Sequence, residues 1–120
     1  MIKTKSQITI FHNPRCSKSR QTLNLLKEQG VEPEIFEYLK TPPDKGKLNE
    51  ILNLLNLQPR DLMRKKEKVY QEQALSNLEL SRDQLLEAMI QYPILIERPI
   101  VLAKGKAALG RPPENALKIL

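Results

Sequence analysis

The chain contains a single cysteine, Cys16, in a polar and basic stretch. Free cysteines usually pack as small hydrophobic side chains. Within three positions of Cys16, however, the one apolar neighbour is Pro14, so the setting is poor for a core residue. A cysteine among cations is typical of a reactive thiolate. The stretch reads His12-Asn13-Pro14-Arg15-Cys16-Ser17-Lys18-Ser19-Arg20.

Cys16 lies between a predicted strand, residues 7–11, and a predicted helix that begins directly after it. The first turn of a helix presents unpaired N–H groups and the positive end of the helix dipole, and both stabilise a thiolate. The same N–H groups can bind an oxyanion. We therefore expect a lowered thiol pKa beside an anion site, with further positive charge from four nearby side chains: His12, Arg15, Lys18 and Arg20.

One cysteine restricts the chemistry. No disulfide can form within the chain, and a Cys-x-x-Cys oxidoreductase is excluded because Ser19 stands where the second cysteine would be. A structural zinc site needs about four Cys or His ligands, whereas this chain has one of each. An oxidised or modified Cys16 would need a thiol from another molecule to regenerate it.

The elements around Cys16 follow from the apolar pattern and the turn residues. A helix after Cys16 ends at Gly30, which suits the left-handed position of a Schellman motif with Val31 making its apolar contact. A second strand is predicted at residues 35–39, parallel to the first through a right-handed crossover. The middle of the chain is predicted to be helical, with a capping box at Ser81 and Gln84.

The last part of the chain predicts two strands, residues 100–103 and 106–109, joined by a two-residue turn at Lys104-Gly105. A final helix is predicted over residues 113–120. The element order is then β-α-β, a helical middle and β-β-α. This order indicates an α/β protein with a thioredoxin-like fold, as one domain spanning residues 1–120 with a helical insertion at about 43–93.

Four blocks of residues, in the same order along the chain, resemble the glutaredoxin-linked arsenate reductase (ArsC) family, and the resemblance covers essentially the whole chain. It is closer to a shorter branch, because well-studied members have Gly-Thr at the position of Ser17-Lys18 and extend further than Leu120. The blocks are His12–Arg20, Leu62-Met63-Arg64-Lys65-Lys66, Glu97-Arg98-Pro99-Ile100-Val101 and Gly110-Arg111-Pro112-Pro113.

The resemblance implies a function for each block. Cys16 would be the nucleophile, His12 would lie near the thiol and support its low pKa, and Pro99 would be a cis-proline facing the active site. The substrate would be arsenate, reduced to arsenite through an S-linked adduct on Cys16. External glutathione and glutaredoxin would complete the reaction, with no bound cofactor. The anion would be held by three guanidiniums, which match tetrahedral oxygens better than lysines do: Arg64, Arg98 and Arg111.

Other interpretations of these residues stay open. Each arginine could be a solvated surface charge, least so Arg98 because it stands at the start of an apolar run, and His12 could simply pack beside the loop. The chain could also be a regulator resembling the Spx type, which binds RNA polymerase without catalysis. Nucleic-acid binding is a weaker alternative, since any protein with a net charge of +6 binds nucleic acid weakly.

The composition is that of a soluble globular protein, with 40% hydrophobic and 28% charged residues. The longest apolar run, residues 100–103, is far too short to cross a bilayer. We expect a cytoplasmic monomer that binds a small anion and no specific nucleic acid.

Overall fold

The computed structural model describes residues 8–120, so Gln7, the first residue of the predicted first strand, lies outside the described residues. These residues form two compact units. Unit 1 comprises the described residues up to Thr41 together with Arg98–Leu120, and unit 2 comprises Pro42–Glu97. Among residues 8–120, no helix is both long enough and apolar enough to span a membrane.

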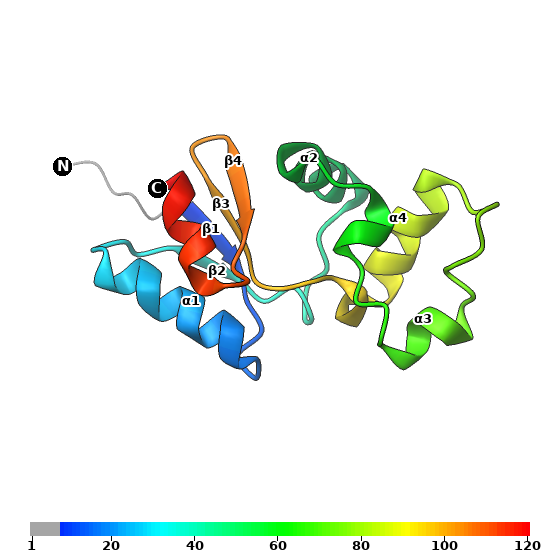
Figure 1. Ribbon diagram of the computed structural model, residues 1–120, viewed down its shortest axis with the longest axis horizontal. Helices are drawn as coiled ribbons and strands as arrows, with labels where there is room; N and C mark the ends of the chain where they lie inside the picture. Colours follow the sequence, from blue (N-terminus) through cyan, green and yellow to red (C-terminus); the bar gives the residue numbers. More distant parts are fainter. Residues whose placement is uncertain (1–7) are drawn as a thin grey trace. The chain divides into compact units, whose positions relative to one another are not determined.

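Unit 1 is built on a four-stranded sheet (Figure 1). Its strands are β1 (Ile8–Phe11), β2 (Glu34–Phe36), β3 (Ile100–Ala103) and β4 (Lys106–Leu109), in the spatial order β2-β1-β3-β4. β1 and β2 are parallel, as predicted, and the other two pairs are antiparallel. This is the thioredoxin-like arrangement that the element order predicts.

The second strand is shorter than the predicted 35–39. It ends at Phe36 because the next residues fold into a turn. The backbone N–H groups of Lys40 and Thr41 both donate to the carbonyl oxygen of Glu37, at 3.0 and 3.1 Å. Those bonds take the backbone away from the sheet.

Helix α1 (Ser17–Glu28) and the 3₁₀ segment η4 (Pro113–Ile119) pack together on one face of the sheet (Figure 1). The strand register places Ile8 opposite Ala103 and Ile10 opposite Val101, so all four side chains face the same side. The apolar stripe of α1 closes this core with Leu23 and Leu26. The predicted C-terminal helix therefore exists, as a tighter 3₁₀ helix.

The two predicted turns that frame these elements are confirmed. Gly30 has φ +79°, and the N–H of Val31 donates to the carbonyl of Leu26 at 3.1 Å, which is the closing bond of a Schellman motif. Lys104 and Gly105 have φ +54° and +73°. Two such residues in succession make the tight turn that the β3–β4 hairpin requires.

Unit 2 is helical, as predicted. It contains α2 (Lys45–Leu55), α3 (Lys68–Glu72) and α4 (Arg82–Gln91), with short 3₁₀ turns η2 (Pro59–Leu62) and η3 (Pro93–Leu95). Ser81 and Gln84 form the predicted capping box at the start of α4. The apolar faces of α2 and α4 bury Leu48, Ile51, Leu52, Leu85, Leu86 and Met89.

Gly110, which directly follows β4, lies where no side chain fits. A Cβ atom built on it would stand 2.5 Å from Thr22 Oγ1 and 2.7 Å from Pro99 Cγ. Gly110→Ala is therefore expected to lower the free energy of unfolding by about 1–3 kcal/mol, since either α1 or the start of β3 must move. Urea denaturation measures this change.

Gly46→Ala is the matched control for that experiment. The nearest atom to a Cβ at Gly46 is Asp44 Oδ1 at 3.5 Å, an ordinary contact. Because Gly46 is in the first turn of α2, alanine there should leave stability unchanged or raise it by up to about 1 kcal/mol. Equal stability of wild type and Gly110→Ala would show that the close approach is not a constraint.

Candidate active site

Cys16 is the N-cap residue of α1, with extended backbone angles of φ −97° and ψ 124°. The loop before it is tied down from both sides. The N–H of Cys16 donates to Asn13 O at 3.0 Å, and Arg20 Nη1 donates to Pro14 O at 2.8 Å. Cys16 is mostly buried, with 9% of the residue exposed. The thiol is therefore held by the packing at the start of the helix.

Several groups act on the pKa of the Cys16 thiol. Burial raises it, but the backbone N–H groups of Ser19 and Lys18 and the guanidinium of Arg98 outweigh burial, and the net pKa is below its ordinary value. Arg98 acts both through its charge and through a hydrogen bond to the sulfur. Lys18 and Ser19 are the second and third residues of α1, whose N–H groups lack helical partners. The predicted lowering of the thiol pKa is thus present.

The side chains of His12 and Ser19 form a hydrogen bond between the loop and the first turn of α1. His12 Nδ1 lies 2.7 Å from Ser19 Oγ, and the same Oγ accepts a hydrogen bond from the N–H of Asn13 at 3.0 Å. Both side chains are buried. Ser19 therefore joins the loop to the helix through its hydroxyl while its N–H faces the sulfur.

The surroundings of His12 favour its neutral imidazole. Burial lowers the pKa of His12, Glu37 raises it, and Arg20 and Lys27 lower it, with a net pKa below the ordinary 6.5. This direction disfavours the positive charge that the sequence suggests for His12. The catalytic role of His12 stays a prediction.

Arg98 and Arg111 lie in unit 1 with Cys16. Arg98 lies two residues before β3 and Arg111 two residues after β4. The Nη1 of Arg111 donates to the carbonyl oxygen of Arg98 at 3.1 Å. The peptide bond between Arg98 and Pro99 is cis, as the family resemblance implies, and the one between Arg111 and Pro112 is cis as well. Unit 1 thus contains the Cys16 thiol at the start of α1 and two arginines, one on either side of the β3–β4 hairpin.

Arg64 belongs to unit 2. Its N–H donates to the carbonyl oxygen of Leu95 at 2.7 Å, and its guanidinium forms ion pairs with Glu67 and Glu97. It is half-buried rather than part of a solvated basic face, whereas the adjacent Lys65 and Lys66 are exposed. These two ion pairs were not foreseen, although the spacing from Arg64 to Glu67 is a usual one for an ion pair.

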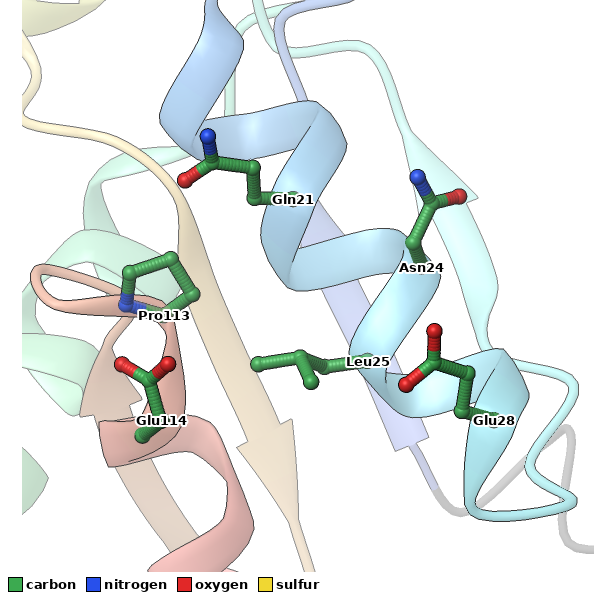
Figure 2. Close-up of a pocket in the computed structure, with 6 residues that line it drawn as sticks. All are labelled: Gln21, Asn24, Leu25, Glu28, Pro113 and Glu114. Carbon is green, nitrogen blue, oxygen red and sulfur yellow. The ribbon is translucent and has the colours of Figure 1, made fainter.

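Unit 1 also carries a groove of about 290 Å³ between α1 and η4 (Figure 2). Figure 2 shows Leu25 pointing from α1 toward Pro113 and Glu114. The predicted site residues do not line this groove. Within residues 8–120, no group of three His, Cys, Asp or Glu side chains could hold a metal ion. The groove is lined by Gln21, Asn24, Leu25, Glu28, Pro113 and Glu114.

A family model described as the ArsC family matches residues 11–119, a span that includes the loop, Cys16 and all three arginines. The chain belongs to the ArsC family. This ArsC-family chain is 55% identical over 115 residues to YfgD, an uncharacterized protein of Escherichia coli K12, with 95% of this chain and 97% of the relative covered.

Two further relatives of this ArsC-family chain carry the name arsenate reductase. One, from Neisseria meningitidis serogroup A, is 53% identical over 115 residues, covering 95% of this chain and 98% of the relative. The other is a solved structure from Vibrio cholerae with a TM-score of 0.92 and 48% identity, covering 94% of this chain and 97% of that one. This chain and the Vibrio cholerae structure therefore share the thioredoxin-like fold.

Proposed function

We propose that this protein is an arsenate reductase in which the Cys16 thiolate attacks arsenic. The observation that carries the proposal is the Cys16 sulfur at the start of α1, with its pKa lowered by two backbone N–H groups and by Arg98. A lowered pKa raises the fraction of thiolate near pH 7, and the thiolate is the nucleophile. The names of the related proteins supply the substrate class.

In the first step the Cys16 thiolate forms a bond to arsenic, and one arsenate oxygen leaves as hydroxide or water. Arsenate carries about two negative charges at neutral pH, so it must be held against the charge of the thiolate. Arg98 and Arg111 of unit 1 offer charged donors for its oxygens, and by the family resemblance we assign Arg64 to the same task. The product of the step is an S-linked arsenate on Cys16.

The later steps need thiols from outside the chain. Reduction of As(V) to As(III) takes two electrons, and two thiols that end as a disulfide supply them. Since Cys16 is the one cysteine of the chain, we assign the reductant to glutathione, which attacks the adduct, and to glutaredoxin, which reduces the resulting mixed species. Glutathione and glutaredoxin end as a mixed disulfide, and water then hydrolyses the bond from arsenic(III) to Cys16, which releases arsenite and returns Cys16 to the thiol.

The test is arsenite production from arsenate by the purified protein. We expect turnover with glutathione and glutaredoxin together and much less with either one alone. A thioredoxin system in place of both is the control for the identity of the thiol donor. If no thiol donor supports arsenite production, the reductase proposal is wrong. Capture of RNA polymerase by the same inactive preparation would then favour the alternative function, that of a regulator that binds RNA polymerase without catalysis.

A further inference from the structure

The guanidinium of Arg64 is paired with two carboxylates inside unit 2. Its Nη1 lies 2.6 Å from Glu67 Oε2, and its Nε lies 4.0 Å from Glu97 Oε1. The side chains are 27%, 23% and 28% exposed in the order Arg64, Glu67 and Glu97. The contact with Glu67 is short and half-buried, unlike the exposed ion pairs that contribute little to stability.

The backbone around Arg64 is fixed by two segments that run antiparallel. Met63 and Ile96 form an isolated β-bridge, and both side chains are buried. The N–H of Glu97 donates to the carbonyl oxygen of Leu62 at 2.8 Å, in addition to the bond from Arg64 to Leu95. These backbone bonds therefore fix the distance between the Cα atoms of Arg64 and Glu97.

Glu67 is held against Arg64 by the chain itself. Its N–H donates to the carbonyl oxygen of Arg64 at 3.1 Å, closing a turn between the two residues. Glu67 is also the N-cap residue of α3, but its side chain makes no capping hydrogen bond to that helix. The Glu67 carboxylate therefore pairs with the Arg64 guanidinium and does not cap α3.

From this geometry we propose that Glu67 is a positioning residue for Arg64, assisted by Glu97, and that it prepares the guanidinium to bind an oxyanion. The inference rests on the proposed function through the assignment of Arg64 to the anion. An arginine side chain loses rotamer freedom when it binds a ligand, and one that is already held loses less. Glu67 also repels an anion, but its charge is already matched by the adjacent Arg64 guanidinium, so we expect the lost orientation to outweigh the lost repulsion.

The variant that tests the proposal is Glu67→Ala. We expect it to raise both the dissociation constant for arsenate and KM by about 3- to 10-fold, with kcat changed by less than about twofold. Glu67→Gln keeps an oxygen acceptor at the same place and should recover arsenate binding to within about twofold of wild type. The matched control is Glu50→Ala, because Glu50 pairs with Lys47 at 2.9 Å with the same spacing on the surface of α2.

A double-mutant cycle separates positioning from a general loss of stability. In the Arg64→Ala background, Glu67→Ala should weaken arsenate binding no further, since the group that it orients is gone. Equal effects of Glu67→Ala with and without Arg64, or tighter binding by Glu67→Ala, would overturn the proposal. Urea denaturation of each variant confirms that the folded protein is being compared.

Calorimetric titration with arsenate distinguishes this inference from the proposed function. If the wild type binds arsenate without producing arsenite, the reductase proposal fails while the role of Glu67 is still decided by the binding constants. If the wild type turns arsenate over and Glu67→Ala is indistinguishable from Glu50→Ala, the inference fails alone. Absence of arsenate binding to the wild type would overturn both.

Discussion

Cys16→Ser is expected to lower the rate of arsenite production by about 10³-fold or more, to the level of the reaction without protein. A serine hydroxyl at this position is not ionised near pH 7, and the chain has no second thiol to take over the attack. The measurement is arsenite formed from arsenate with glutathione and glutaredoxin in excess. This is the largest effect that the structure leads us to expect.

Two further measurements make the result interpretable. Ser17→Ala, at the exposed next residue along the chain, should retain activity within about twofold of the wild type, since Ser17 is not among the groups that shift the thiol pKa and the substitution keeps its backbone N–H. Urea denaturation of Cys16→Ser should show a folded protein, because serine is itself a good N-cap residue. Substantial activity in folded Cys16→Ser would mean that sulfur is not the nucleophile.

Arg98→Leu is expected to raise the pKa of the Cys16 thiol and to lower kcat/KM for arsenate by about 10- to 100-fold. The sign follows from the two charge states: the Arg98 cation favours the thiolate over the thiol, so its removal makes the proton harder to lose. The rate of Cys16 alkylation against pH reports the thiol pKa directly. The midpoint of that curve should move to higher pH than in the wild type.

Two arginine-directed variants serve as controls for Arg98→Leu. Arg98→Lys keeps the positive charge and loses the planar fork, so its alkylation midpoint should lie between those of the wild type and Arg98→Leu. Arg15→Leu removes an exposed cation next to Cys16 in the chain that is not among the groups shifting its pKa. An identical midpoint in Arg98→Leu and Arg15→Leu would contradict the role assigned to Arg98.

The parts of this fold that could be predicted from the sequence are those specified locally. The Schellman motif at Gly30, the capping box at Ser81 and the turn at Lys104-Gly105 each depend on a few neighbouring residues, and all three are present. The end of β2 was wrong by three residues, since the competing turn after Phe36 depends on backbone bonds that side-chain pattern does not reveal.

The chemical environment of the site was less accessible to sequence reasoning. Placing Cys16 at the start of α1 was sufficient to predict a lowered thiol pKa, but the cation responsible is Arg98, which is remote in sequence and not one of the basic residues of the loop. From the sequence, Ser19 was interpreted only as the residue at the position of the second cysteine of a Cys-x-x-Cys motif. Its hydroxyl contact with His12 joins residues seven positions apart and depends on how the loop meets the helix.

The β3–β4 hairpin limits how this protein can change in length. The pairing of Ile100 with Leu109 continues outward through the hydrogen bond from Gly110 to Pro99, which brings Arg98 and Arg111 to facing positions. A single inserted residue at Lys104-Gly105 would either replace the two-residue turn by a longer loop or slip the register, and a slip by one residue would turn one strand's side chains to the opposite face of the sheet. The pairing of positions 98 and 111 therefore depends on the length of the turn at the far end of the hairpin, so descendants of this sequence can exchange residues in that turn more readily than they can gain or lose one.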